Sequence, residues 1–279
     1  MRSLAVHAGD QLNEEKTMRT RVITTAIATT AVGFMFLAQE GTVQTASVGV
    51  FASNGVKAVM EALVPQAERA IGHPLAIQFN TSASLKQRIE AGEAFDVAVM
   101  TSDLIDDLLK QGKIAAGTSA GMARSGIGVG IRTGAPKPDI STPEALKRTL
   151  LNAKAITYAQ DGASRVHILK MLDRFGIAEA VKSKTILEQG SIRSTARVAD
   201  GDAELVLTLV SEILPIKGIE LAGALPGELQ TYVSLSAGVG AKTRNAEAAK
   251  ALVKFLTSPA IAPTLKAKGM EPLAVKTSR

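Results

Sequence analysis

The chain has 279 residues, carries a formal net charge of +6, is 46% hydrophobic and contains no cysteine. The lack of cysteine excludes thiol catalysis, cysteine metal ligands and disulfides, and the length allows one large domain or two modest ones. Lysine and arginine are interspersed with acidic residues and only 3% of the residues are aromatic, so the sequence does not predict nucleic-acid binding. The slight positive charge favours a small anion as partner.

The N-terminal region predicts export. Arg19 and Arg21 precede an apolar stretch at 22–37, and small and polar residues follow it. This order is typical of a secretory signal peptide, and the stretch is shorter than the ~20 residues of a membrane-spanning helix. We therefore interpret residues 1–46 as a leader and signal peptide that is cleaved near residues 45–46, which predicts a periplasmic mature protein. A buried N-terminal helix is the alternative.

From residue 47 the first part of the mature chain alternates strands and helices. The helices have apolar residues at three- and four-residue spacing and end at glycine or close to it. Three strand–helix units in about 70 residues require right-handed crossovers and predict a parallel sheet. The predicted elements are strands at 47–53, 75–80 and 95–101 and helices at 54–72, 85–92 and 103–114.

The second part of the mature chain changes this rhythm with a glycine-rich strand and a proline-rich turn at 125–139. Thr142 as N-cap and Pro143 at the first helical position then predict a helix start, because both residue types are favoured there. With no internal repeat and no low-complexity linker, we predict an α/β fold of two units of ~100 residues. The further predicted elements are helices at 142–153, 164–177, 192–202 and 245–273 (interrupted at Pro259), a strand at 155–160, a strand at 203–213 that runs into helix or loop, and an extended segment at 231–241.

The serine-rich turn NTSASL at 80–85 does not fit a nucleophile site. A serine hydrolase needs glycines beside its serine and a histidine base, and this turn has no glycine. Of the three histidines, His7 lies in the predicted leader, His73 precedes a proline in a turn, and His167 lies in a predicted helix as a packed or edge residue. We therefore predict no catalytic residue and a protein that is not an enzyme.

Metal and nucleotide sites are also poorly supported. Asp103, Asp106 and Asp107 cluster at one predicted helix start, where capping and the helix dipole already explain an acidic residue. The alternating glycines at 126–130 are followed by neither a Gly-Lys-Ser/Thr sequence nor a helix, as a phosphate loop would require. We predict neither a metal nor a cofactor.

Three strand-to-helix turns carry small polar residues instead. In a parallel sheet such turns lie at the carboxyl edge, where ligands bind. Backbone N–H groups at a helix start, with hydroxyl groups beside them, suit an oxyanion, although each turn taken alone is also explained as a helix cap. The three turns comprise Ser53, Asn54 and Gly55, then Thr81, Ser82 and Ala83, and finally Asp161 to Ser164.

Three segments carry a family resemblance: VFASNGVKAVMEAL at 50–63, FNTSASLKQRIEAGEAFDVAVMT at 79–101 and AAKALVKFLTSPAIAPTLKAKGMEP at 248–272. The middle one combines a serine-rich turn, a helix and a Phe-Asp-Val strand. With these segments the chain resembles the solute-binding proteins of ABC importers, most of all the periplasmic molybdate-binding proteins. The resemblance covers nearly all of the mature chain. It implies the type II periplasmic-binding fold, which is α/β and two-lobed, each lobe a mostly parallel sheet flanked by helices, joined by two hinge crossings.

The same resemblance implies ligand-binding positions in the first lobe. The family's second-turn serine falls on Ser82, and its first-turn serine falls on Gly55, where no hydroxyl group remains. Ser53, Asn54 and Thr81 lie next to these two positions and are further candidates for ligand binding.

In the second lobe the family's two backbone N–H contacts fall on Ser164 and Ile192, and its molybdate-binding tyrosine falls near Leu209. Leucine has no hydroxyl group, so with Gly55 two of the family's polar contacts are changed. Arg165 and Arg193 stand beside the backbone positions. They are candidates for pairing with a carboxylate of an organic acid, and exposed helix arginines are the alternative.

We therefore predict a monomeric, exported solute-binding protein. It captures a small anion, either a molybdate-like oxyanion or a small organic acid, and delivers it to the membrane permease of an ABC importer. The first lobe is predicted to contain residues 47–128 and 237–279 and the second 129–236. Closure of the two lobes on the ligand produces the state that the permease recognises. An effector-sensing or catalytic derivative of the same fold is the alternative.

Overall fold

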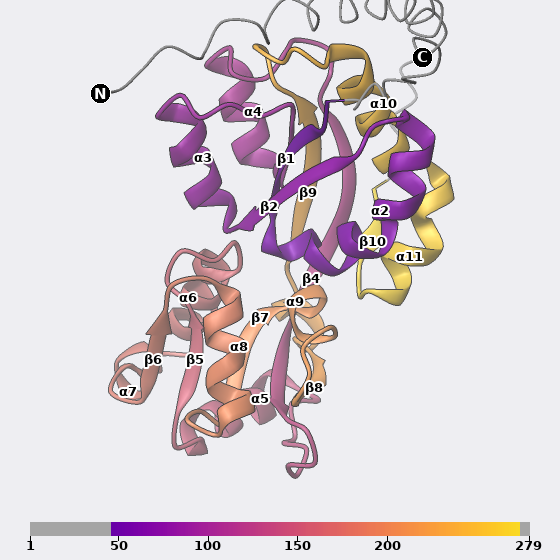
Figure 1. The fold of residues 1–279 in the computed structure, drawn as a ribbon. Coiled ribbons are helices and arrows are strands. Elements are labelled where there is room, and N and C mark those ends of the chain that lie inside the picture. Colours follow the sequence, from indigo (N-terminus) through magenta and orange to yellow (C-terminus); the bar gives the residue numbers. More distant parts are fainter. Residues whose placement is uncertain (1–45, 274–279) are drawn as a thin grey trace, which may run out of the picture. The chain divides into compact units, whose positions relative to one another are not determined.

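The computed structural model describes residues 46–273, and the predicted leader lies outside them. The described chain is an α/β protein of two lobes, and the predicted fold class is confirmed (Figure 1). None of the helices within residues 46–273 has the length and apolar character needed to span a bilayer.

The first lobe is built on the strands β1 (Val48–Ser53), β2 (Leu75–Asn80), β3 (Val97–Thr101) and β9 (Tyr232–Val239). Strand β1 lies between β2 and β3 and pairs with both in parallel. Strand β9 joins the other edge of β3 in the antiparallel direction. The three strand–helix units of the sequence thus give the parallel pairs, because each helix returns the chain to the same edge of the sheet.

Helices cover both faces of this sheet (Figure 1). They are η1 (Asn54–Val56), α2 (Lys57–Ile71), α3 (Ser82–Glu90), α4 (Ser102–Lys110), α10 (Ala246–Leu256), η3 (Pro259–Ile261) and α11 (Ala262–Ala267). Helices α2, α10 and α11 bury apolar residues against one face, and α3 and α4 bury theirs against the other. Helix α2 ends at Gly72, whose φ of 72° is a left-handed cap conformation that glycine adopts easily.

The second lobe is built on β4 (Ala120–Arg132), β5 (Ile156–Ala159), β6 (Thr185–Glu188), β7 (Leu205–Leu209) and β8 (Ile219–Ala224). Strand β5 pairs in parallel with β6 and β7, while β7 and β8 pair with β4 in the antiparallel direction. Its helices are α5 (Pro143–Asn152), α6 (Arg165–Arg174), α7 (Ala178–Lys182), α8 (Ser191–Asp200), α9 (Val210–Ile213) and η2 (Gly227–Leu229).

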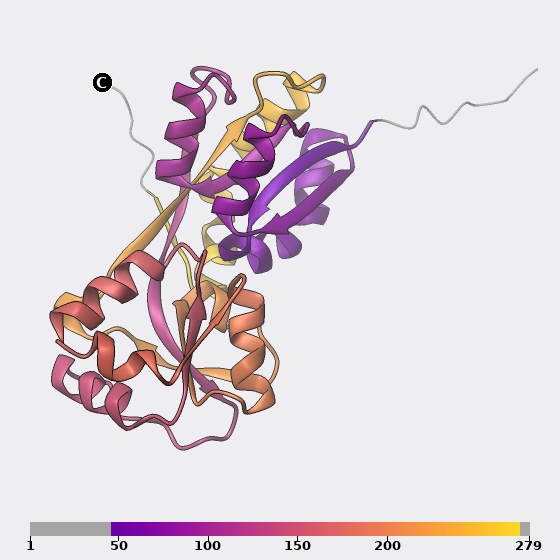
Figure 2. The ribbon, with the colours of Figure 1, turned by 90° about the vertical axis from the view of Figure 1, so that its left-hand side faces the viewer.

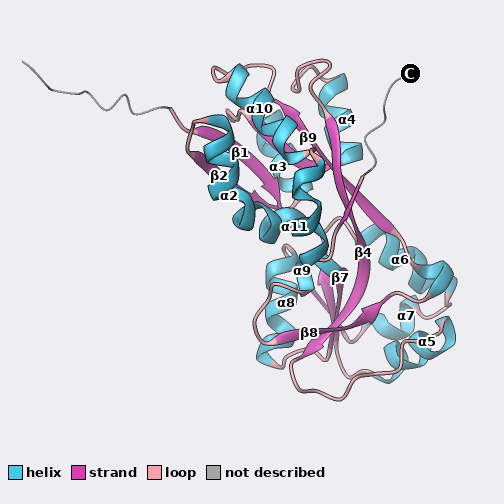
Figure 3. Ribbon diagram, turned by 90° about the vertical axis from the view of Figure 1, so that its right-hand side faces the viewer, coloured by secondary structure: helices cyan, strands magenta, loops and turns pink. Residues whose placement is uncertain are grey.

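Strands β4 and β9 connect the two lobes (Figure 2). The first half of β4 pairs with β9, and its second half pairs with β7 and β8, so one strand runs through both sheets (Figure 3). The strand β10 (Glu271–Pro272) returns to pair with β4. The lobe boundaries given above from the sequence stay a prediction.

The side chain of Gln230 joins the two connecting segments. Its Oε1 accepts hydrogen bonds from the backbone N–H groups of Ile127 and Thr231, both at 2.9 Å, and its Nε2 donates to the carbonyl of Ile127 at 3.0 Å. A Cβ at Gly126 would lie 3.0 Å from that Nε2. Glycine at position 126 therefore leaves the room that this amide occupies.

Candidate functional site

In the turn after β1, the hydroxyl of Ser53 makes a hydrogen bond and the side-chain oxygen of Asn54 makes none within the described residues. Ser53 caps η1, with its Oγ accepting from the N–H of Gly55 at 3.3 Å. Asn54 is only 8% exposed, and its Oδ1 has no hydrogen-bond partner among the described residues. A Cβ at Gly55 would lie 3.1 Å from Cδ1 of the buried Leu209. Leucine at 209 therefore fills the space next to a glycine that has no side chain.

The turn after β2 begins helix α3. Thr81 is the N-cap, and its Oγ1 accepts from the N–H of Ser84 at 3.2 Å, as such caps do. Ser82 is 5% exposed, and its Oγ accepts from the N–H of Thr101 at 3.2 Å. The hydroxyl of Ser82 thus connects the start of α3 to the end of β3 within the first lobe.

The turn before α6 reaches across to the first lobe. The carboxylate of Asp161 accepts a hydrogen bond from Thr81 Oγ1 at 2.9 Å and another from the N–H of Gly190 at 2.8 Å. Ser164 is buried, and its side chain makes no capping hydrogen bond to α6. The structure therefore brings the turns of Thr81, Asp161 and Gly190 together through one carboxylate.

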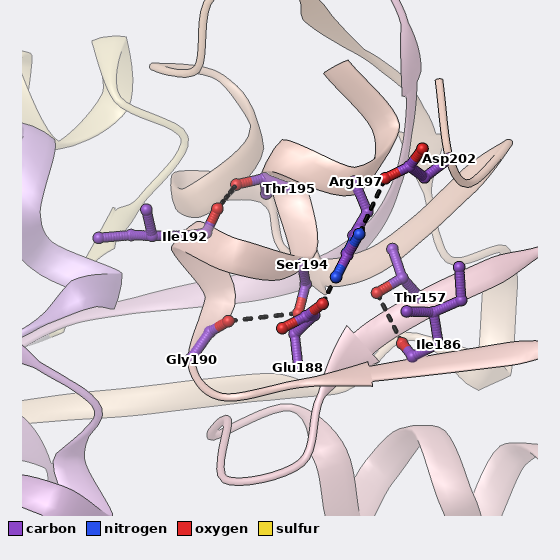
Figure 4. Close-up of polar contacts among 9 residues, drawn as sticks. All are labelled: Thr157, Ile186, Glu188, Gly190, Ile192, Ser194, Thr195, Arg197 and Asp202. Carbon is purple, nitrogen blue, oxygen red and sulfur yellow. Dashed lines mark hydrogen bonds and ion pairs between the residues drawn. The ribbon is translucent and has the colours of Figure 1, made fainter. Parts of the chain in front are cut away.

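The turn before α8 is held from inside the second lobe (Figure 4). Thr195 Oγ1 donates to the carbonyl of Ile192 at 2.9 Å, and Arg197 is paired with Glu188 and Asp202. The side chain of Ile192 itself is 47% exposed. Gly190 has φ 77° and ψ 154°, a conformation that is essentially restricted to glycine. Backbone geometry, and not side-chain chemistry, defines this start of α8.

Glu212 is a polar residue of this region that the sequence reasoning missed. Its carboxyl accepts from Ser191 Oγ at 2.8 Å and from Thr208 Oγ1. Burial raises the pKa of Glu212, and the two hydroxyl hydrogen bonds oppose that shift only in part. The available signal was its place directly after the apolar strand β7, where ligand-facing residues of such sheets lie.

A small cavity of about 120 Å³ lies beside Glu212 and is lined by Asn54, Ser191 and Ser211 among others. Ser211 is 3% exposed, and its Oγ has no hydrogen-bond partner among the described residues. With Asn54 Oδ1, two buried polar atoms of this cavity are thus unpartnered, which is rare in folded proteins.

A larger cavity of about 740 Å³ contains the two arginines that the sequence singled out. Arg165 at the start of α6 and Arg193 in the first turn of α8 line it together with Asn80 and Ser84 from the first lobe. Both arginines are exposed, and neither forms a salt bridge within residues 46–273. Two guanidinium groups beside the N-terminus of α3 form a site suited to a carboxylate.

A second cavity of about 380 Å³ lies between the lobes and shares Ala83 and Asp161 with the arginine cavity. Its polar lining includes Ser82, Ser102 and His167. Burial, and then Lys170, lower the pKa of His167, while Asp103 acts in the opposite direction. His167 therefore lines a cavity, whereas the sequence suggested a packed or edge histidine.

The described residues contain no group of three or more histidine, aspartate or glutamate side chains that could hold a metal ion. The prediction that Asp103, Asp106 and Asp107 do not bind a metal stays a prediction. Asp107 instead pairs with Lys86 of the neighbouring helix α3, and this lysine lowers the pKa of Asp107.

Comparison with known proteins adds the family. The model of the bacterial extracellular solute-binding proteins matches residues 48–271. A protein named aconitate isomerase, from a Pseudomonas species, is 30% identical over 230 residues, which cover 80% of this chain and 87% of that protein. The molybdate-binding protein ModA of Azotobacter vinelandii is 26% identical over 233 residues, which cover 81% of this chain and 90% of that protein.

Comparison with solved structures also finds proteins of similar fold. The solved structure of the periplasmic molybdate-binding protein of Azotobacter vinelandii matches with a TM-score of 0.68 and 16% identity over 82% of this chain and 100% of that chain. At this identity the match concerns the fold alone. The predicted resemblance to molybdate-binding proteins is confirmed at the level of fold and family.

Proposed function

The chain belongs to the family of bacterial extracellular solute-binding proteins, and from this premise we propose that it captures a small organic acid between its two lobes. In this proposal the mature protein acts in the periplasm as a monomer. The lobes close on the ligand, and the permease of an ABC importer recognises the closed state. In this proposal the ligand reaches the permease without chemical change.

The observation that carries the proposal is the arginine cavity. Arg165 and Arg193 come from two different helices of the second lobe and line one cavity with residues of the first lobe. Guanidinium groups bind carboxylates through paired, charge-assisted hydrogen bonds. The 30% identical relative named for aconitate, an organic acid, supports the same class of ligand.

Molybdate is a poorer candidate for this chain. Gly55 and Leu209 offer no hydroxyl group, and their contact fills the space with apolar atoms. The polar donors expected to surround a tetrahedral oxyanion are therefore reduced in number.

A thermal-shift screen of the mature protein tests the proposal. The ligands are cis-aconitate, trans-aconitate, citrate and malonate, with molybdate, tungstate, sulfate and phosphate as the competing class. A ligand at 100 times its Kd adds about 2.7 kcal/mol to the free energy of unfolding, which raises the Tm of a domain of this size by roughly 5–10 °C. A Tm increase with an inorganic oxyanion and with none of the organic acids would contradict the proposal.

Arginine variants locate the ligand. Arg165→Gln and Arg193→Gln each remove a charge-assisted hydrogen-bond donor, and we expect each to weaken organic-acid binding about 10- to 100-fold in isothermal titration calorimetry. Arg174→Gln is the matched control, because Arg174 ends the same helix α6 and pairs with Glu228 away from the cavity. Equal affinities of all three variants would place the ligand elsewhere.

A second candidate function is isomerisation of an unsaturated organic acid. It is favoured by the relative named aconitate isomerase, and Glu212, a carboxyl that lines the cavity of about 120 Å³, is the candidate for proton exchange. Proton NMR of either aconitate isomer incubated with the protein tests it. Conversion that is lost in Glu212→Gln while binding persists would support this candidate, and unchanged substrate after prolonged incubation would reject it.

A further inference from the structure

Asp161 holds a place that a bound anion would be expected to take. One oxygen of its carboxylate accepts from Thr81 Oγ1 in the first lobe at 2.9 Å, and the other accepts from the N–H of Gly190 in the second lobe at 2.8 Å. Thr81 is the N-cap of α3 and Gly190 is the N-cap of α8. Two helix N-termini, which favour negative charge, therefore meet on a carboxylate supplied by the chain itself.

The position of Asp161 also divides the space between the lobes. Asp161 and Ala83 belong to the lining of both interlobe cavities. The cavity of about 740 Å³ contains Arg165 and Arg193, and the cavity of about 380 Å³ contains Ser102 and His167. Cationic groups thus lie on one side of the carboxylate, and hydroxyl and imidazole groups together with the Asp103 side chain lie on the other.

The negative charge of Asp161 disfavours a compact oxyanion at the N-termini of α3 and α8. Molybdate and sulfate carry two negative charges within a few ångströms, so at the N-termini of α3 and α8 they would lie against the Asp161 carboxylate, and like charges at that distance repel. An extended organic acid avoids this repulsion because its acid groups can be separated by several bonds.

We propose that Asp161 determines the class of ligand: it excludes compact inorganic oxyanions and selects an organic acid with at least two acid groups. One carboxylate of that ligand lies at Arg165 and Arg193, and a second polar group lies in the cavity lined by Ser102 and His167. This inference rests on the proposed capture of an organic acid and names the ligand more closely, as a di- or tricarboxylate. Asp161 acts as a specificity-determining residue that contacts the ligand.

The test compares two ligand classes on one pair of variants. Affinities for molybdate, sulfate, citrate and trans-aconitate are measured by isothermal titration calorimetry for the wild type, Asp161→Asn and Asp173→Asn. Asparagine at 161 keeps the shape of the side chain and removes its charge. Asp173→Asn changes the net charge equally, but Asp173 is an exposed residue of α6 outside both cavities.

We expect Asp161→Asn to bind molybdate or sulfate at least 10-fold more tightly than the wild type. The ratio of tricarboxylate affinity to oxyanion affinity should fall by at least the same factor, and Asp173→Asn should leave that ratio unchanged. An unchanged ratio in Asp161→Asn would overturn the proposal. Should Asp161→Asn not fold, Asp161→Ser provides the same comparison, since it also removes the charge.

The outcomes separate this inference from the proposed function. If no organic acid binds the wild type but Asp161→Asn gains oxyanion binding, the proposed ligand class is wrong and the exclusion by Asp161 stands. If the wild type binds a monocarboxylate such as acetate as tightly as it binds citrate, the requirement for two acid groups is wrong. Tight wild-type binding of molybdate overturns the exclusion itself.

Discussion

Gly55 and Leu209 contact each other where the related binding proteins are expected to place hydroxyl groups. A Cβ at 55 would lie 3.1 Å from Leu209 Cδ1, which is tighter than ordinary packing. We expect Gly55→Ala to cost about 1 kcal/mol of unfolding free energy and Leu209→Ala about 2–4 kcal/mol. Because the second change removes the crowded methyl groups, the double variant should cost about 0.5–1 kcal/mol less than the sum.

Urea unfolding of the four proteins measures this coupling. Strict additivity of the two costs would mean that the residues do not crowd each other, and the apolar contact would no longer explain the loss of the family's polar positions.

Glu212 makes the stability of the protein depend on pH in a defined direction. Burial raises its pKa above the ordinary 4.5, so the folded protein holds this proton more tightly than the unfolded chain does. Its contribution to stability is therefore fully present below about pH 4.5 and is lost as the pH rises toward the folded-state pKa. Glu212→Gln cannot titrate, so relative to it the wild type should lose stability as the pH rises above about 4.5.

Tm values measured at half-unit steps of pH check this difference. Glu247→Gln is the control, because the Glu247 side chain is 89% exposed and its variant should follow the wild type at every pH. Parallel curves for the wild type and Glu212→Gln would show that the carboxyl titrates as it would in water.

At the scale of elements, one side-chain amide adds to the pairing of β4 and β9 that connects the lobes. The Gln230 side chain satisfies backbone groups of Ile127 and Thr231 on two different segments. Gln230→Ala removes one donor to the carbonyl of Ile127, which still accepts from the N–H of Leu225 at 3.0 Å, so we expect a cost of about 0.5–1.5 kcal/mol. We expect amide hydrogen exchange at Thr231 to accelerate at least about 10-fold because its N–H loses this acceptor. Exchange at Ile127 should accelerate less, because its N–H also donates to the carbonyl of Thr231 at 3.3 Å.

Mass spectrometry of deuterium-exchanged peptides measures these exchange rates, with Gln111→Ala as the control. Gln111 is exposed at the end of α4, and its side chain bonds only to Glu90 and Asp107. Equal exchange at Thr231 in both variants would mean that the strand pairing alone holds the connection.

The elements with strong apolar periodicity were predicted well. The three strand–helix units of the first lobe are confirmed, and so are the N-cap Thr142 and the start of a helix at Pro143. Helix α7, strand β6 and strand β8 were not predicted. Helix α7 has five residues, and β6 and β8 carry mostly half-buried side chains, so none of them has the apolar pattern on which such predictions rest.

At the scale of the whole molecule, the predicted turns were easier to find than their contacts. Thr81 and Asp161 lie 80 residues apart in the chain, and only the packing of the two lobes brings them to 2.9 Å. The sequence singled out Ser82 but did not show that its Oγ accepts a hydrogen bond from the backbone N–H of Thr101 on the next strand. Local patterns report helix caps, whereas contacts between distant turns depend on tertiary structure.

The path of the chain has a consequence for the order of folding. Strand β9 and helices α10 and α11 complete the sheet and core that begin with β1, yet they are synthesised after the whole second lobe. The second lobe is formed by one continuous stretch of the chain, whereas the first lobe is formed by a stretch before it and a stretch after it. Contacts between residues close in the sequence form fastest. We therefore expect the second lobe to fold before β9, α10 and α11 have packed against the N-terminal strands. Until then these strands are incompletely covered, so the first half of the nascent chain is the part that most needs protection from aggregation.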